Sequence, residues 1–446
     1  MNAPLKNFTT NSLEAHWMPF TGNRAFKADP RLLVKSQGVY SWDHKGNKIV
    51  DGSSGLFCVA AGHGRKEIAD AVHAALLEND YVAPFQSAQP TSFALAQKVA
   101  NICPEEINHV FFTNSGSESI DTALKICMAY HRAKGDGQRT RFVSRERAYH
   151  GVNIGGVSLS GMVKNRETFS GVMPNVVVMR HTHSQDEKFH RGQPKNNGVE
   201  LANDLQRMCE TYGASTIAAV FVEPVAGSTG VLIPPVGYLE RLREICDENG
   251  ILLVFDEVIC GFGRLGAPFA SQKFGVTPDI MTLAKALTNG AQPMGAVAVK
   301  DEIYDTVVNA APENAIEFFH GYTYSGHPAA CAAGLAAQEI YENENLFQRA
   351  ADMSDYFLDG MWSLQDLDIV TDIRGMGLLA AVDIAAKGAP GSRGSGVQAR
   401  LFNNGMHVKF TGDCGIVAPP LVSEKADIDL MIATLRKTLE EEMAAA

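Results

Sequence analysis

Apolar runs of strand length alternate with amphipathic stretches of helical spacing through the middle of the chain. This alternation predicts an α/β fold with a mostly parallel sheet covered by helices. The expected strands are Val110–Thr113, Arg141–Ser144, Val176–Met179, Ile217–Glu223, Ile251–Asp256, Ile280–Leu283 and Gly295–Val299. The expected helices are Glu118–Lys134, Val199–Tyr212 and Tyr238–Glu248.

The two ends of the chain have a different pattern. Short apolar segments at Gly38–Trp42 and Lys48–Val50 flank a polar turn, which predicts a hairpin. We expect a large domain of residues 61–327 and a smaller α+β domain of residues 328–446 completed by residues 1–60. Further helices are expected from about residue 64 (with Ile68, Ala71, Val72, Ala75 and Leu76 on one face) and at Ser92–Ile102, Ala329–Glu342 and Leu346–Leu364. The last part should hold a strand at Leu378–Ile384, a Gly- and Ser-rich loop at Lys387–Gly396 and a C-terminal helix.

The composition is that of an ordinary globular protein. Of 446 residues, 45% are hydrophobic and 20% are charged, which excludes a disordered chain and a coiled coil. The formal net charge of −11 disfavours nucleic acid as a partner. The eight cysteines form no CxxC pair, so we expect reduced thiols and no metal site. Because no apolar leader or membrane-length apolar run is present, we expect a cytoplasmic protein without a membrane partner.

Two residues at the ends of apolar strands suggest chemistry. Asp256 closes the segment Leu252–Asp256, and Lys285 follows the next strand, 285 − 256 = 29 positions later. In open α/β sheets, ligands bind at the carboxyl ends of the strands. A lysine among apolar neighbours loses part of its preference for the charged form, which leaves a nucleophilic amine. An isolated aspartate at such a position is about as often the start of a solvated loop, and an isolated lysine is far more often a surface charge, but together the two residues suggest one site.

Pyridoxal phosphate (PLP) requires an amine for its aldehyde, a carboxylate for its pyridine nitrogen, a stacking surface and a phosphate cup. Lys285 and Asp256 supply the first two. The segment Thr113–Glu118 has the pattern of a strand, a turn and a helix start, which suits a phosphate. Tyr149 and Val258 offer stacking surfaces. The sequence therefore predicts a PLP enzyme.

The chain resembles the class III PLP-dependent aminotransferases of fold type I, and within them the ω-amino acid (β-alanine):pyruvate aminotransferase group. The resemblance covers nearly the whole chain. It rests on the segments Trp17–Phe20, Ser53–Leu56, Ala61–His63, Phe111–Glu118, Tyr149–Gly151, Val222–Val225, Pro234–Leu239, Phe255–Arg264, Ala284–Lys285 and His320–Pro328.

The resemblance implies roles for individual residues. Lys285 would hold the cofactor in a Schiff base, and Asp256 would bind its pyridine nitrogen. Thr323 would reach the phosphate of a neighbouring subunit, so we expect a homodimer or homotetramer and an inactive monomer. The other cofactor-binding residues implied are Ser115, Gly116 and Ser117 at the phosphate, Tyr149 and Val258 around the ring, and His150 and Glu223 nearby.

The substrate pocket departs from the family pattern at two positions. Lys409 stands where relatives carry a mobile arginine that binds the substrate carboxylate, and lysine keeps the charge without the planar fork. Phe57 stands where close relatives carry tryptophan, which would widen the pocket. Trp17, Leu56, Phe85 and Tyr149 are the other residues that the resemblance suggests for the pocket wall, with a place in the core or at an interface as the alternative for each.

The reaction implied is ping-pong transfer of an amino group from an ω-amino acid or primary amine, with β-alanine favoured, to pyruvate. Transaminases for 4-aminobutyrate, ornithine, taurine or a diamine are the nearer alternatives, with a catalytically inactive family member as another. A dinucleotide-binding enzyme is the remaining alternative, because Gly261–Gly266 matches GxGxxG. That motif is followed by a poor helix start and leaves Asp256 and Lys285 unexplained, so we regard it as a chance match.

Overall fold

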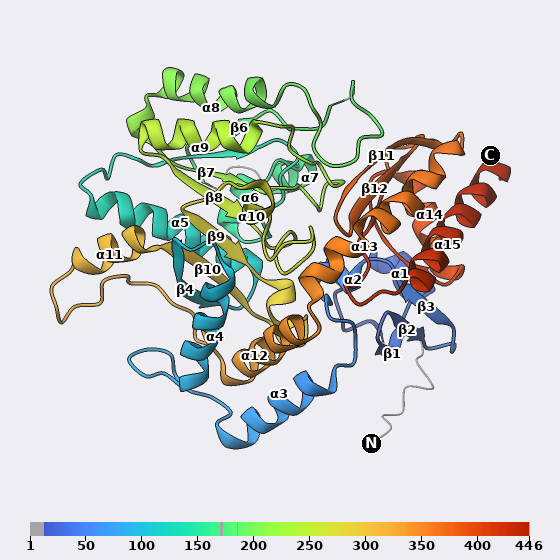
Figure 1. The fold of residues 1–446 in the computed structure, drawn as a ribbon, viewed down its shortest axis with the longest axis horizontal. Coiled ribbons are helices and arrows are strands. Elements are labelled where there is room, and N and C mark those ends of the chain that lie inside the picture. The colour runs from blue at the N-terminus through green and yellow to red at the C-terminus, as the bar shows by residue number, and fades with distance from the viewer. Residues whose placement is uncertain (1–12, 170–172, 185, 446) are drawn as a thin grey trace.

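A seven-stranded sheet lies at the centre of the computed structural model, which describes residues 13–169, 173–184 and 186–445 (Figure 1). Its strand order is β4-β10-β9-β8-β7-β5-β6. The pairs from β6 to β9 are parallel, as predicted, whereas β10 is antiparallel to both β4 and β9. The strands are β4 (Ile107–Thr113), β5 (Arg141–Arg145), β6 (Val176–Met179), β7 (Ile217–Val222), β8 (Leu252–Asp256), β9 (Ile280–Leu283) and β10 (Gly295–Lys300).

Helices cover both faces of this sheet, so every position of β7 and β8 is buried. Phe221 and Val254 pack in an apolar cluster with residues of α5. The residues beside them, such as Val222 and Leu253, join a second cluster with α8 and α9 on the other face. The helices of this part are α5 (Gly116–Ala133), α6 (Ile154–Leu159), α7 (Val163–Thr168), α8 (Gly198–Tyr212), α9 (Tyr238–Asn249), α10 (Ala270–Phe274) and α11 (Asp301–Asn309), with the 3₁₀ turns η2 (Ala214–Thr216) and η3 (Lys285–Thr288).

Residues 33–51 and the C-terminal part from residue 370 lie together beside the central sheet (Figure 1). The predicted hairpin is confirmed, and its second strand pairs in parallel with β13 near the C-terminus, in the order β1-β2-β3-β13. A second small sheet has the order β11-β12-β15-β14. The strands are β1 (Leu33–Gln37), β2 (Tyr40–Asp43), β3 (Lys48–Asp51), β11 (Val370–Met376), β12 (Leu379–Ile384), β13 (Met406–His407), β14 (Lys409–Thr411) and β15 (Cys414–Val417). The domain boundaries at residues 60 and 327 stay a prediction.

Long helices connect these two parts. The helix predicted over residues 329–342 is α12, and it packs against α3 and α4. The predicted apolar face of α3 is only partly buried in the single chain, since Ile68 is buried and Leu76 is exposed. The remaining helices are α1 (Asn23–Ala28), α2 (Ser54–Phe57), α3 (Lys66–Glu78), α4 (Pro90–Ile102), α12 (Pro328–Asn343), α13 (Leu346–Trp362), η4 (Ser363–Asp366), α14 (Ser392–Asn403) and α15 (Lys425–Ala444).

The loop predicted over residues 387–396 is wrong in its second half, because α14 begins at Ser392. Glycine has a low helix propensity, so the glycines of this segment led to the prediction of a loop. A Cβ on Gly394 would lie 2.0 Å from the carbonyl oxygen of Gly412, so this glycine allows the helix to contact the chain before β15. The sequence interpretation also missed β11 and the short strands β13, β14 and β15.

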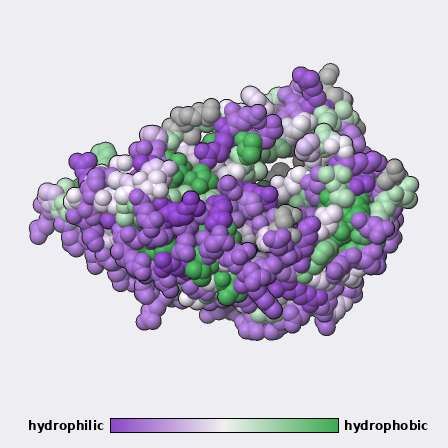
Figure 2. All heavy atoms as spheres, turned by 90° about the horizontal axis from the view of Figure 1, so that it is seen from above, coloured by the Kyte–Doolittle hydropathy of each residue, from purple (hydrophilic) through white to green (hydrophobic). Residues whose placement is uncertain are grey.

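The surface and the thiols agree with the composition. The face in Figure 2 is mostly hydrophilic, with apolar residues in separate small groups. All eight cysteines are free, and every one except Cys58 is buried. None of the helices in the described ranges combines the length and apolarity needed to cross a membrane.

Candidate active site

A cavity of about 330 Å³ opens at the carboxyl ends of the parallel strands. It collects residues from the ends of β4, β7, β8 and β9 and from the loop after β5. Nine of the residues predicted for the site line it: Ser115, Gly116, Ser117, Tyr149, His150, Glu223, Asp256, Val258 and Lys285. Most of the predicted cofactor contacts therefore meet in one place.

The N-terminus of α5 forms one wall of the cavity. Ser115 is its N-cap, and its Oγ accepts a hydrogen bond from the N–H of Glu118 at 3.2 Å. The first N–H groups of a helix have no partner inside the helix. The N–H groups of Gly116 and Ser117, which line the cavity, are thus suited to an anion such as phosphate.

Asp256 lies at the end of β8 and is held from two sides. Its Oδ2 is 2.8 Å from Nδ1 of His150, and its Oδ1 accepts the N–H of Val258 at 3.1 Å. Both His150 and Asp256 are buried. This arrangement fixes the carboxylate in one orientation inside the cavity.

Glu223 is a second buried carboxyl group in the cavity. Its Oε1 accepts the N–H of Tyr149 at 3.0 Å. Burial raises the pKa of Glu223 to about 7, and the nearby negative charge of Asp256 acts in the same direction. Glu223 is therefore able to hold or release a proton near neutral pH.

Lys285 begins the turn η3 directly after β9 and has a positive φ of 50°. That conformation is uncommon for a residue with a side chain and is typical of functional sites. Burial lowers the pKa of Lys285, while the nearby Cys58 and Asp256 act to raise it. The neutral, nucleophilic amine is thereby favoured relative to a surface lysine.

Lys409 does not line this cavity but lies close to it. Its Nζ donates to the carbonyl oxygen of Ser228 at 3.1 Å and lies 5.6 Å from the ring centre of Phe57. Burial lowers its pKa to about 8, and the positive charge of Lys285 adds to this effect. Phe57 is buried, so within the single chain it supports Lys409 rather than facing the cavity.

Four other predicted residues also lie outside the cavity of the single chain. Trp17, Leu56 and Phe85 are all more than half exposed. Phe85 contacts the chain near Gly321, and the hydroxyl of Tyr81 donates to the carbonyl oxygen of Thr323 at 3.1 Å. Phe85 and Thr323 therefore share one exposed region.

The sequence interpretation missed Cys58, which lines the cavity and is the one half-buried thiol of the eight. Nothing in the local pattern distinguishes it from the other cysteines. The turn that follows Lys285 packs against Cys58, since the N–H of Gly290 donates to the carbonyl oxygen of Lys285 at 3.2 Å and a Cβ on Gly290 would lie 3.0 Å from Cβ of Cys58.

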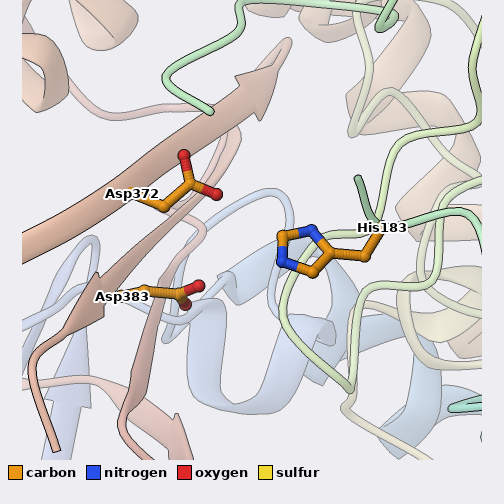
Figure 3. Close-up of side chains that lie close together, drawn as sticks. All are labelled: His183, Asp372 and Asp383. Atoms are coloured by element: carbon orange, nitrogen blue, oxygen red, sulfur yellow. The ribbon is translucent and has the colours of Figure 1, made fainter. Parts of the chain in front are cut away.

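A separate group of His183, Asp372 and Asp383 has the donor atoms of a metal site (Figure 3). The two aspartates face each other across β11 and β12, where like charges destabilise the sheet. Arg374 resolves this, because its Nη1 lies 2.7 Å from Asp372 and 2.8 Å from Asp383. The guanidinium pairs with both carboxylates at once, so the two aspartates belong to an ion-pair network.

Three histidines that stand next to glycines in the sequence, His63, His320 and His327, each contact protein groups. His63 pairs with Asp51, His320 bonds Thr122, and His327 caps α12. The GxGxxG segment forms turns rather than a helix start, and α10 begins only at Ala270. The interpretation of that motif as a chance match is confirmed by the comparisons below.

Comparison with known proteins identifies the family. The family model for class-III aminotransferases matches residues 23–439. The chain belongs to the class III aminotransferases. An ω-aminotransferase from Caulobacter vibrioides is 50% identical, covering 98% of this chain and 99% of the relative. A β-alanine–pyruvate aminotransferase from Pseudomonas aeruginosa is 49% identical, covering 96% of each chain.

A solved structure supports the same assignment. The ω-transaminase from Pseudomonas jessenii in complex with PMP aligns with a TM-score of 0.92 at 30% identity, over 98% of each chain. The predicted fold type I and the aminotransferase activity are thus confirmed. As a class III aminotransferase, the enzyme uses PLP and acts on an amine and a keto acid.

The residues of the cavity fit PLP. The start of α5 suits the phosphate, and Asp256 suits a protonated ring nitrogen. A Cβ on Gly116 would lie 3.2 Å from the methyl groups of Val258, so glycine leaves room between the helix start and this side chain. A Cβ on Gly151 would lie 2.5 Å from Oγ of Ser117, so glycine also lets the loop after β5 close over the helix start.

Proposed function

We propose that this aminotransferase moves the amino group of an ω-amino acid, with β-alanine as the preferred donor, to pyruvate. The products are malonate semialdehyde and L-alanine. The observation that carries the proposal is near 50% identity, over almost the whole chain, to enzymes named for ω-amino groups or for β-alanine and pyruvate. A cytoplasmic location is part of the proposal, and the eight free thiols support it.

Different residues of the cavity would have different roles in the reaction. PLP supplies an aldehyde for the amino group and a ring that withdraws electrons from the adjoining carbon. Asp256, held by His150, keeps a negative charge beside the ring nitrogen. Lys285 Nζ would take the proton from the substrate carbon that bears nitrogen and deliver it to the carbon of the cofactor that carried the aldehyde, since burial favours the neutral form of the lysine.

The remaining contacts would hold the cofactor in place. Ser115, Gly116 and Ser117 bind the phosphate, while Tyr149 and Val258 enclose the ring. Glu223 sits beside Asp256 as a buried proton store, because its pKa is raised to about 7 by burial.

Lys409 would bind the substrate carboxylate. Its Nζ, which projects from β14, lies near Lys285. The hydrogen bond that it donates to the carbonyl oxygen of Ser228 can be replaced by a hydrogen bond to the carboxylate of the substrate. The pocket walls predicted at Trp17, Leu56, Phe57 and Phe85 are part of the proposal.

The proposed active unit is a homodimer or a homotetramer. Thr323 and Phe85 lie together in an exposed region away from this chain's cavity, so they would complete the site of a second subunit. Exposed Leu77, Phe93 and Phe319 support a covered interface.

Half-reaction spectroscopy tests the function. The enzyme loaded with PLP is mixed with β-alanine in the absence of a keto acid, and the visible absorbance of the lysine-bound cofactor is followed. We expect conversion to the pyridoxamine form, reversed by pyruvate and not by 2-oxoglutarate. If 4-aminobutyrate, taurine or a diamine converts the cofactor and β-alanine does not, that amine is the donor and the β-alanine part of the proposal is wrong. Absence of the visible band after loading would overturn the proposal as a whole.

A further inference from the structure

A strained turn lies directly beside the active site. Between β3 and Cys58, the residues Ser54, Gly55 and Phe57 have φ angles of 48°, 69° and 64°. The left-handed region is sparsely populated by residues with side chains, above all by a bulky one such as Phe57. Such a turn persists only when its surroundings determine it, and strain of this kind is typical of functional sites.

The carboxylate of Asp51 holds the turn from inside. Asp51 ends β3 and is buried. Its Oδ1 accepts the N–H of Ser53 at 3.0 Å, and its Oδ2 accepts that of Gly55 at 2.6 Å. An ionised carboxylate only accepts hydrogen bonds, so it satisfies both N–H groups at once.

Two histidines fix the carboxylate itself. Nε2 of His63 lies 2.8 Å from Oδ2, and Nδ1 of His407 lies 3.8 Å from Oδ1 of Asp51. Burial acts to raise the pKa of Asp51, but the histidines and the hydrogen bonds lower it to well below its ordinary value. His407 also stands two residues before Lys409, which connects the network to the proposed carboxylate-binding residue.

A buried arginine holds the turn from the other side. Nη2 of Arg264 donates to Oγ of Ser54 at 2.9 Å, and that hydroxyl donates to the carbonyl oxygen of Ala418 at 2.7 Å. Nη1 of Arg264 also donates to the carbonyl oxygen of Pro419 at 2.6 Å. The turn is thus held between β3 and the segment after β15.

The turn presents two residues to the site. Cys58 lines the cavity beside Lys285, and the ring of Phe57 lies 5.6 Å from Nζ of Lys409. If the turn changed to ordinary backbone angles, the φ of Phe57 would become negative, and the ring of Phe57 and the thiol of Cys58 would both move.

We propose that Asp51 is a positioning residue for the substrate pocket. Its carboxylate keeps residues 53–58 in the strained turn and thereby sets the places of Phe57 and Cys58 beside the cavity. The inference rests on the proposed function in one respect, namely that this side of the cavity receives the substrate.

The test compares Asp51→Asn with Asp43→Asn in the PLP-loaded enzyme. Asp43 is a matched control, since it is buried at the end of β2 and accepts the N–H groups of Lys45 and Asn47 in a turn of the same sheet. Asn replaces one acceptor by a donor, so each variant should loosen its own turn. Two readouts are measured: the KM and kcat for the amine, and the rate at which iodoacetamide labels Cys58, followed by mass spectrometry.

We expect Asp51→Asn to raise the KM for the amine and the labelling rate of Cys58 about tenfold or more, with kcat changed less and the visible cofactor absorbance retained. Asp43→Asn should change neither KM nor labelling. If Asp51→Asn fails to fold, His63→Gln, which alters one contact of Asp51, should raise both quantities by a smaller factor.

The proposal is overturned if the folded variant retains the wild-type KM, whether or not labelling increases. It is also overturned if Asp43→Asn raises both quantities equally. The amine is whichever donor converts the cofactor of the wild-type enzyme, so failure of β-alanine as donor would overturn the proposed function alone.

Discussion

At the scale of single residues, burial shifts the pKa values of the side chains that we propose for the chemistry. Lys285, Lys409 and Glu223 all have pKa values shifted toward neutral pH, and desolvation is the largest cause for each. The sequence predicted these positions because they end apolar strands or match family motifs. It could not give the size of the shifts, which depends on the atoms that surround each group.

Lys409→Ala should raise the KM for pyruvate about 10- to 100-fold, because a charge-assisted hydrogen bond to the carboxylate is lost. Lys409→Arg should keep the KM within a few-fold of wild type. In the wild type, the KM should rise as the pH passes about 8, because the positive form of Lys409 is then lost. Steady-state kinetics from pH 6.5 to 9.5 measure both effects. An unchanged KM in Lys409→Ala would show that another group binds the carboxylate.

Glu257→Gln should remove part of the pH dependence of stability. Burial raises the pKa of Glu257 to about 7, so the folded state keeps a proton that the unfolded state loses above about pH 4.5. The free energy of unfolding of the wild type should therefore fall as the pH rises from about 4.5 to 7, by at most about 3 kcal/mol from this group. Urea unfolding at pH 5 and pH 8 gives the free energies of unfolding of the wild type and of Glu257→Gln for this comparison. The exposed Glu313→Gln is the control, and an equal slope in both variants would contradict the assignment.

At the scale of elements, hydrophobic periodicity predicted the strands of the central sheet and its long helices α5, α8 and α9, but it missed the shorter helices α6, α7, α10 and α11. The buried strands β7 and β8 are evident as apolar runs. The helix α14 was missed because it contains two glycines, of which Gly394 allows contact with Gly412, 412 − 394 = 18 positions later in the chain. Short strands such as β13 lack a pattern of their own, since only pairing with β3 defines them.

Two glycines of α14 should respond to alanine in opposite ways. In Gly394→Ala the new Cβ would meet the carbonyl oxygen of Gly412, which should lower the free energy of unfolding by about 1–3 kcal/mol or more. Gly396 is exposed and has open space around it, so Gly396→Ala should raise stability by about 0.5–1 kcal/mol. Thermal and urea unfolding of the two variants measure this. The same sign for both would contradict the packing of α14 described above.

At the scale of the whole molecule, the active site depends on segments from the entire chain. The proposed pocket joins β3 near the N-terminus, the ends of the central strands and β14 near the C-terminus. The exposed region around Thr323 and Phe85 extends this dependence to a second subunit under the proposed function.

Mixing two inactive variants tests the shared site. Lys285→Ala removes the amine, and Thr323→Asp would place a negative charge against the phosphate bound in the neighbouring subunit. Each variant alone should be nearly inactive. Co-expressed at random they should regain about a quarter of wild-type activity, because half of the dimers are mixed and each mixed dimer has one intact site. No gain in a verified mixed dimer would show that Thr323 does not serve the partner.

The sequence by itself determined the fold class and the family, and it named the residues that we propose to carry the chemistry. It did so because buried strands must be apolar and because PLP requires an amine, a carboxylate and a helix start at the ends of such strands. Only the tertiary structure decided what surrounds those residues. Burial, the bond between His150 and Asp256, and the contacts of Ser54 in the strained turn with Arg264 and Ala418 all arise from segments that are distant in sequence. A local pattern carries no information about such neighbours, so these features come from the folded chain alone.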